Sequence, residues 1–367
     1  QPGEPPCSRA ARGARMHRAP TAGQLSAWHV RLPTRNKMFV RSCSLSSWSA
    51  AGAAAVAARA PASPPPLPSS PATPPPKPGS RSMATSGAGA GAGRVRLAVV
   101  GDVHDDWILD EDTKALHFLQ PDLVLFTGDY GNENVQLVKS ISDLQFPKAA
   151  ILGNHDCWRT HQFSEKKVDC VRLQLERYGV DDMSGSVRKI YDAATAAPEE
   201  HSVILLAHNG PTGLGSRIDD ICGRDWVAGG GDHGDPDLEQ AISDLQRETG
   251  VSIPLVVFGH MHKSLAYGGG LRKMIAFGAN NQTIYLNGAV VPRVKPAEAM
   301  SPSTISTSER DELQESGSVG PTSRAFTTVD LFDGTVEKIS EVWVLVSGAR
   351  AELEEETVLY KRPREHM

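Results

Sequence analysis

The sequence predicts an α/β fold in which short buried strands alternate with helices and deliver polar side chains at their ends. Five apolar runs are each too short for an isolated helix, and each leads into Asp, Asn or His. Segments with helical periodicity separate the first three runs, which is the pattern of parallel strands joined by crossover helices. After residue 262 the chain changes to short β segments, with a hairpin turn at Asp333-Gly334. We therefore expect a parallel core followed by antiparallel β-structure.

The first run, residues 97–100, is continuously aliphatic and β-branched, which indicates a strand buried on both faces. Gly101 allows a sharp turn after it and presents Asp102 and His104 at the carboxyl end of the strand, where ligand sites of α/β sheets usually gather. Because these two residues are separated by one position, their side chains project to the same side of extended backbone. A carboxylate and an imidazole placed together suit a divalent metal ion.

The same arrangement recurs four more times. The runs 122–126, 149–152, 202–206 and 255–258 lead into Gly128-Asp129, Gly153-Asn154-His155-Asp156, His208 and Gly259-His260-Met261-His262. If the runs lie side by side, their carboxyl ends converge on one rim. Taken singly, each polar residue has an ordinary explanation as a turn residue, a helix cap or a structural histidine. Their number and shared position are what make a functional interpretation preferable.

Seven oxygen and nitrogen donors exceed what one tetrahedral zinc ion uses, so the pattern predicts two metal ions with positions left open for water and substrate. A set of carboxylate, amide and imidazole ligands without thiolate suits Mn²⁺, Fe or Zn²⁺. The candidate ligands are Asp102, His104, Asp129, Asn154, His208, His260 and His262.

Periodicity and capping signals place the other elements. Acidic residues at 110–112 suit a helix start and Pro121 ends that helix, while Pro236 opens another. The predicted helices are residues 110–120, 134–144, 162–178, 183–196 and 237–248, and the later strands are 273–277, 283–286, 289–291, 326–331 and 336–346.

Residues 1–93 have one acidic and eleven basic residues, with long Ala, Ser, Pro and Gly tracts, and are expected to be disordered. A composition rich in Arg, Ser and Ala and poor in acids is typical of an organelle transit peptide. Its Ser and Pro content favours a chloroplast over a mitochondrion as the destination. The alternative is a disordered tail without a targeting role.

Residues 94–346 are expected to form the folded domain, with a disordered Ser, Thr, Glu and Pro-rich insertion at 292–324 and a solvated charged tail at 347–367. Beyond residue 93 the chain carries 27 basic and 42 acidic residues, a net charge of −15 that disfavours nucleic-acid binding. No apolar run approaches the roughly 20 residues of a membrane helix, so no membrane partner is expected. The five cysteines show no spacing typical of a zinc ribbon or a disulfide framework.

The order of these motifs closely resembles the signature of the calcineurin-like metallophosphoesterase superfamily, over roughly residues 94–346. The motifs are Asp102-Val103-His104, Gly128-Asp129, Gly153-Asn154-His155-Asp156, His208 and Gly259-His260-Met261-His262. The opening residues 101–107 and the segment 207–215 resemble a plant and cyanobacterial subgroup. The resemblance implies a β-sandwich of mixed sheets flanked by helices, with a dinuclear metal site at the carboxyl ends of the strands.

The resemblance also implies roles for single residues. Asp102, His104, Asp129 and His262 would bind the first metal ion, and Asp129, Asn154, His208 and His260 the second, with Asp129 bridging. Two such ions lower the pKa of a shared water to give an attacking hydroxide. The catalytic candidates are His155, which would contact the phosphate or protonate the leaving oxygen, and Asp156, which would orient His155.

The sequence also departs from relatives in the superfamily. The protein Ser/Thr phosphatases carry an Arg shortly after the second Asp and a Glu ending the third motif; here no Arg follows Asp129 and Asp156 replaces the Glu, which disfavours a phosphoprotein substrate. Between Cys157 and His201, where many members have further strands, none is predicted. We therefore expect a phosphatase or phosphodiesterase acting on a small phosphoester or nucleotide-type substrate. The alternatives are a non-catalytic metal-binding scaffold that docks partners and a nuclease of the same superfamily.

Overall fold

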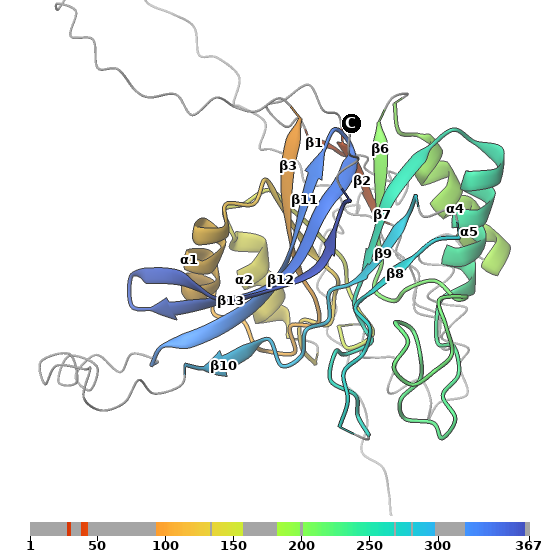
Figure 1. The fold of residues 1–367 in the computed structure, drawn as a ribbon. Coiled ribbons are helices and arrows are strands. Elements are labelled where there is room, and N and C mark those ends of the chain that lie inside the picture. The colour runs from red at the N-terminus through yellow and green to blue at the C-terminus, as the bar shows by residue number, and fades with distance from the viewer. Residues whose placement is uncertain are drawn as a thin grey trace, which may run out of the picture.

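The computed structural model describes residues 28–30, 38–42, 93–132, 134–156, 182–198, 201–267, 269–279, 282–297 and 320–363. Two mixed β-sheets pack face to face, and helices cover their outer faces (Figure 1). This is the predicted mixed α/β sandwich, and it is consistent with a metallophosphoesterase fold. Within the described residues, no helix combines the length and the hydrophobicity that a membrane span requires.

The first sheet has the strand order β13-β12-β11-β3-β4-β5. Strands β3 (Arg94–Val100), β4 (Leu123–Phe126) and β5 (Lys148–Ala150) are parallel, and the helices α1 (Leu109–Leu119) and α2 (Val135–Asp143) connect them. Strands β11 (Thr322–Phe332), β12 (Thr335–Ser347) and β13 (Arg350–Lys361) extend the sheet antiparallel from β3. The short β10 (Val294–Pro296) pairs with β11.

The second sheet has the order β1-β2-β6-β7-β9-β8. Its centre is parallel: β6 (Ser202–Leu206) pairs with β7 (Ser252–Phe258), and β7 pairs with β9 (Ile284–Asn287). Strand β8 (Ile275–Phe277) is antiparallel to β9, and β2 (Met38–Ser42) is parallel to β6 with β1 (Trp28–Val30) beyond it. The helices α4 (Met183–Thr195) and α5 (Pro236–Glu248) pack on the outer face.

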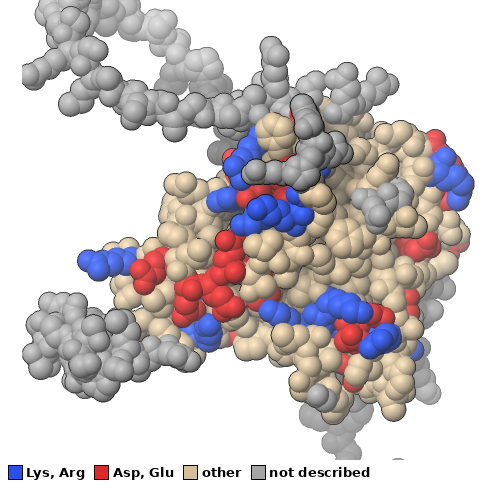
Figure 2. All heavy atoms as spheres, viewed as in Figure 1, with Lys and Arg blue, Asp and Glu red and all other residues tan. Residues whose placement is uncertain are grey.

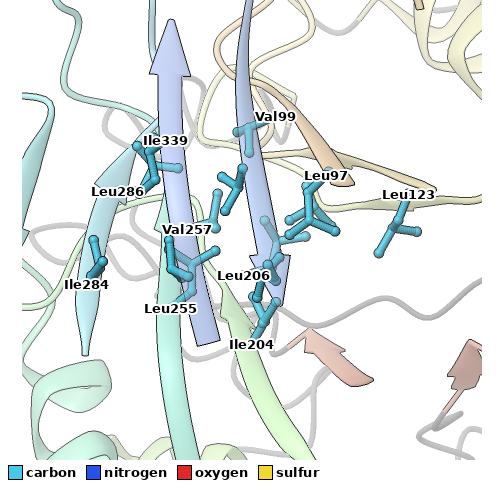
Figure 3. Close-up of a cluster of buried hydrophobic side chains, with 14 of the residues drawn as sticks. Leu97, Val99, Leu123, Ile204, Leu206, Leu255, Val257, Ile284, Leu286 and Ile339 are labelled. Atoms are coloured by element: carbon cyan, nitrogen blue, oxygen red, sulfur yellow. The ribbon is translucent and has the colours of Figure 1, made fainter. Parts of the chain in front are cut away.

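Alternate side chains of the parallel strands β3, β4, β6 and β7 pack into two different hydrophobic cores, one between the sheets and one beneath the helices. This explains why the sequences of these strands are continuously apolar. Leu97 and Val99 of β3 point between the sheets, together with Leu206 of β6 and Val257 of β7 (Figure 3). Ala98 and the other alternate residues of β3 face α1 and α2. The parallel strands β3, β4, β6 and β7 therefore have no polar face, and their polar residues lie at their ends.

The predicted helices in the described part of the chain agree with the structure to within one or two residues. The side chain of Asn134 accepts a hydrogen bond from the backbone N–H of Leu137 and so begins α2, and Pro236 opens α5. The predicted turn at Asp333-Gly334 connects β11 and β12 with positive φ at both residues. The predicted helix 162–178 lies outside the described residues.

Four expectations differ from the structure, two of them in the C-terminal part of the chain. The charged tail predicted at 347–367 contains β13, whose acidic side chains are mostly exposed while its backbone pairs with β12. In Figure 2, a group of acidic side chains lies over the region that β12 and β13 occupy in Figure 1. The two ends of the predicted insertion 292–324 pair with each other as β10 and the start of β11, and residues 298–319 lie outside the described part.

The predicted strand 289–291 is a loop, because Val290 and its neighbours fill the core beside β11 without pairing. At the other end of the chain, the segment 1–93 was expected to be disordered throughout. Residues 28–30 and 38–42 instead form β1 and β2, and the rest of the segment up to residue 92 lies outside the described residues. Strand β2 pairs in parallel with β6 along its whole length.

Candidate metal centre

The carboxyl ends of five strands meet at one edge of the sandwich and bring all seven predicted ligands together. The loops that follow β3 and β4 are tied to each other, because the backbone N–H of His104 donates to the carbonyl of Asp129 at 2.9 Å. The backbone is left-handed at Asp102, His104, Asp129 and His260, with φ between 44° and 65°. Such a concentration of strained residues is typical of a functional site.

The first group of ligands consists of Asp102, His104 and His262, whose ligand atoms all lie within 4.8 Å of one another. The two Nε2 atoms of His104 and His262 are only 2.9 Å apart, and Nε2 of His262 lies 3.5 Å from Oδ2 of Asp102. Asp102 is completely buried, and the backbone N–H of His260 donates to its Oδ1. Its Oδ2 has no hydrogen-bond partner among the residues that the structure describes.

The second group consists of Asp129, His208 and His260, again with ligand atoms within 4.8 Å. Asn154 belongs to the same cluster, because its Oδ1 lies 2.8 Å from Nε2 of His208 and 2.9 Å from Nδ1 of His260. Oδ2 of Asp129 lies 3.4 Å from Nε2 of His208. The bridging role implied for Asp129 stays a prediction, since its carboxylate is placed with the second group.

These residues fit metal ions. Nδ1 of His208 donates to the carbonyl of Thr127 at 2.8 Å, so Nε2 is the ring atom that turns toward Asp129 and Asn154. Carboxylate and amide oxygens that can only accept hydrogen bonds therefore face imidazole nitrogens across a buried space. The unpartnered Oδ2 of Asp102 repeats this feature in the first group. A cation satisfies such converging lone pairs, whereas an apolar or anionic group does not.

Burial and the charges of neighbouring ligands shift the pKa values of the carboxylates and imidazoles at the centre. Burial, with a contribution from the Asp129 carboxylate, raises the pKa of Asp102 to about 7. Burial, with His104 adding to it, lowers the pKa of His262 to about 4, and burial also lowers the pKa of His104 and His260. Burial opposes a charge on His208, but Asp129 outweighs it and raises the pKa of His208 to about 9. Metal binding would therefore have to displace the proton of His208.

Two glycines allow the ligands to approach this closely. A Cβ atom at Gly153 would overlap Oδ1 of Asp129 and the ring of His208, and one at Gly259 would overlap Asp102. Any side chain at these positions would displace a ligand from its place. The glycines preceding the ligands in the sequence are thus part of how the site is built.

The two predicted catalytic residues have different surroundings. The His155 ring lies edge-on to His104, with centroids 5.0 Å apart, and its Nδ1 lies 2.9 Å from Oδ1 of Asn132. Asp156 accepts backbone hydrogen bonds from Tyr130, Gly131 and Gly153. The carboxylate of Asp156 thus joins the loops after β4 and β5, and Asn132 takes the place next to the His155 ring that the sequence interpretation gave to Asp156.

Sequence reasoning missed two residues beside the centre, His233 and Arg272. The ring of His233 stacks on that of His260, with centroids 5.4 Å apart and an interplanar angle of 22°. The guanidinium of Arg272 is buried and donates to the carbonyls of His262, Asp220 and Gly223. No local motif marks either residue, because their contacts join loops that are far apart in the sequence.

Residues 95–264 match the model of the Calcineurin-like phosphoesterase family. Among solved structures, the chain is similar to a conserved uncharacterized protein of Streptococcus pneumoniae TIGR4 described as a predicted phosphoesterase (12% identity, 72% of this chain and 98% of that chain, TM-score 0.29). It is also similar to GAP50, the anchor in the inner membrane complex of Plasmodium (11%, 74% and 90%, TM-score 0.37), and to a dimetal phosphatase from Danio rerio (10%, 73% and 99%, TM-score 0.40). No curated protein matches the chain. The family match and the two ligand groups support a metal-dependent phosphoesterase.

Proposed function

We propose that this chain hydrolyses a small phosphoester or nucleotide-type substrate with two divalent metal ions, for which Mn²⁺, Fe and Zn²⁺ are the candidates. The observation that carries the proposal is the pair of adjacent ligand groups, Asp102-His104-His262 and Asp129-His208-His260, with Asn154 against the second. When bound, two such ions supply positive charge that polarises a phosphoryl group and acidifies water. Without metal ions, the buried carboxylates of this ligand set would cost free energy because no Lys or Arg compensates their charge among the described residues.

The protein's own residues contribute orientation and proton transfer. Asp102 and Asp129 are held at fixed positions by backbone N–H donors from His260 and His155. Since the oxygen of Asn132 accepts a hydrogen bond from Nδ1 of His155, that ring is oriented beside His104. We assign His155 to contact the phosphate or to protonate the leaving oxygen. Asp156 is a positioning residue that acts through the backbone of Tyr130 and Gly153.

A hydrolysis assay tests the proposal. Wild-type chain and the Asp129→Asn variant are each loaded with Mn²⁺ and given p-nitrophenyl phosphate, an aryl phosphate with a visible product. We expect the variant to lose more than about 100-fold in kcat/KM, because a ligand is at least as important as the residues that orient ligands. Asp110→Asn is the matched control, since the Asp110 side chain is 75% exposed and pairs only with Lys114 on the surface of α1.

Equal rates for wild type and Asp129→Asn would refute the proposal. Stoichiometric metal by elemental analysis, combined with no hydrolysis of phosphomonoesters, diesters or pyrophosphates, would also refute it and indicate a metal-binding scaffold. A nuclease is disfavoured by the acidic composition beyond residue 93.

The location of the activity is a separate proposal. The Arg, Ser and Ala-rich composition of residues 1–93 supports import into a chloroplast. Residues 1–93 fused to a fluorescent protein are expected to direct it to plastids. Fluorescence in mitochondria, or throughout the cell, would contradict this assignment.

A further inference from the structure

Arg224 is an arginine without a counter-charge in a molecule that pairs most of its partly buried cations. Buried or half-buried Arg272, Arg293 and Arg324 each contact a carboxylate. The Arg224 side chain, by contrast, has no hydrogen bond or ion pair with any described residue, and its buried Nε lacks a partner. A cation that is partly removed from water and left unpaired costs free energy unless an anion binds to it.

Arg224 lies close to the candidate metal centre. Its backbone N–H donates to the carbonyl of Gly231, and the N–H of His233 donates to the carbonyl of Cys222, so the two segments run antiparallel as a narrow loop. The Arg224 charge lowers the pKa of His233, second to the effect of burial. Because His233 stacks on His260, the loop that carries Arg224 lies against the second ligand group.

The same loop presents an aromatic surface. Trp226 packs edge-on against His233, with ring centroids 5.0 Å apart, and 47% of Trp226 is exposed. The rings of Trp226, His233 and His260 therefore form a series that starts at the metal ligand and ends at the surface. An exposed indole at the end of such a series offers a face on which a planar group can stack.

The loop is fixed relative to the metal ligands. Asp225, between the two residues in question, accepts a hydrogen bond from the backbone N–H of Ala266 and lies 3.5 Å from the Arg272 guanidinium. Arg272 in turn donates to the carbonyls of His262 and Gly223. A preorganised loop of this kind loses little conformational entropy when a ligand binds.

We infer that Arg224, Trp226 and His233 form a subsite for the leaving group of the substrate. The inference rests on the proposed function and adds the substrate class: a phosphoester whose leaving group contains both a planar aromatic ring and an additional negative charge, as a nucleotide does. Trp226 stacks on the ring, and the Arg224 guanidinium binds the additional anion through charge-assisted hydrogen bonds. The transferred phosphoryl group lies beyond His233, at the ligands themselves.

Substrate selectivity tests the inference. ADP, whose leaving group AMP has both features, is compared with glycerol phosphate, whose leaving group has neither, on the Mn²⁺-loaded full chain. For Arg224→Gln, we expect the ratio of KM for ADP to KM for glycerol phosphate to rise about tenfold or more. For Trp226→Leu, which keeps an apolar side chain without the ring, we expect a rise of about five- to tenfold.

Arg217→Gln is the matched control, because Arg217 lies in the adjacent segment, whose Ser216 carbonyl accepts from Gly231 of the loop, and its side chain is 77% exposed and already paired with Asp219. Its KM ratio should equal that of the wild type. A KM that rises equally for both substrates in Arg224→Gln would overturn the subsite, since Arg224 would then bind the transferred group. Unchanged KM values for both substrates would overturn it as well.

Calorimetric binding of AMP to the metal-free full chain separates this inference from the proposed function. We expect the wild type to bind AMP about tenfold or more tightly than Arg224→Gln does. That difference without any hydrolysis would support the subsite and refute the hydrolase. Hydrolysis of glycerol phosphate combined with equal AMP binding by both chains would refute the subsite and leave the hydrolase standing.

Discussion

Two buried polar clusters lie on either side of the β3–α1 connection, and they handle charge in opposite ways. In the first, here called the ion-pair cluster, Asp112 and Glu111 of α1 contact Arg293 and Arg324. Asp112 is completely buried and accepts from Arg293 and Arg324 at 2.7 Å each. The second cluster, the metal centre, buries Asp102 and Asp129 with no Lys or Arg partner among the described residues.

The comparison of the two clusters distinguishes buried charges that stabilise the fold from buried charges that form a binding site. In the ion-pair cluster both oxygens of Asp112 accept hydrogen bonds, and two cations face two anions, so the charges balance without a ligand even though Nε of Arg293 lacks a partner among the described residues. In the metal centre an oxygen of Asp102 lacks a partner, and imidazole nitrogens face each other. A buried polar cluster that lacks positive charge indicates the ligand that would supply it.

The largest expected effect comes from breaking the ion-pair cluster. Asp112→Ala leaves Arg293 and Arg324 buried with reduced compensation, which should lower the free energy of unfolding by about 3–5 kcal/mol in urea denaturation. Asp110→Ala, an exposed acid of the same helix, should lower it by less than about 0.5 kcal/mol. If the two variants lost similar amounts of unfolding free energy, burial of Asp112 would not explain its contribution to stability.

The second prediction concerns the metal centre without a mutation. Mn²⁺ at about 100 times its dissociation constant should raise the free energy of unfolding by about 2.7 kcal/mol, because the folded chain alone presents the ligand groups. In chelator, Asp102→Asn should be at least as stable as the wild type, since it removes an unpaired buried carboxylate. A destabilised Asp102→Asn in chelator would show that the hydrogen bond that Asp102 accepts from the His260 backbone N–H outweighs the cost of burying this charge.

A third, smaller effect is expected at Gly153. Gly153→Ala places a methyl group against Asp129 and His208, so the affinity for Mn²⁺ should fall by about 10–100-fold in a metal titration. Gly250→Ala is the control, because nothing lies within 4 Å of the added Cβ there. If Gly153→Ala bound Mn²⁺ as tightly as the wild type, Asp129 and His208 could move away from the added methyl group without a loss of binding free energy.

The smallest prediction is a pH effect in a partly exposed ion pair. Burial would raise the pKa of Asp330, but the hydrogen bond and charge of Arg96, together with those of Arg94, outweigh burial, and the pKa lies below its ordinary value. Stability from this pair is therefore present above the unfolded-state pKa of about 3.9 and is lost as the pH falls through the folded-state pKa. Since Arg96 is 40% exposed, Asp330→Asn should cost less than about 1 kcal/mol at pH 7. Urea midpoints of the two chains should converge near pH 2, and a gap that widened on acidification would contradict the assignment.

The sequence could predict those parts of the fold that depend on interactions between residues close together in the chain. A strand buried on both faces must be continuously apolar, so residues 97–100 and 202–206 were recognisable, and polar residues at their ends could only be turns or ligands. Caps such as Asn134 mark helix starts for the same local reason. The convergence of the ligands followed from the parallel order of the strands.

Other features could not be predicted because their reasons are distant contacts. Strand β13 forms by backbone pairing with β12, and its side chains are too exposed to leave a hydrophobic pattern. Arg272 and His233 acquire their roles from contacts with His262 and His260, at the far side of a loop. Asp156 lies beside the candidate site, but its carboxylate accepts hydrogen bonds from the backbone N–H groups of Tyr130 and Gly153, a use that its place in the motif does not reveal.

Strand β13 has a consequence for how the molecule meets other copies of itself. It is the outermost strand of the first sheet, so one of its sides offers unpaired backbone groups to any extended chain. Four glutamates line this strand: Glu354 and Glu356 pair with Lys295 and Lys338, and no ion pair is found for Glu352 and Glu355 among the described residues. The charges of Glu352 and Glu355 oppose the approach of a second copy that brings the same charges to this edge. Neutralising these glutamates would remove a barrier to fibrous stacking while leaving the edge with the candidate metal centre untouched.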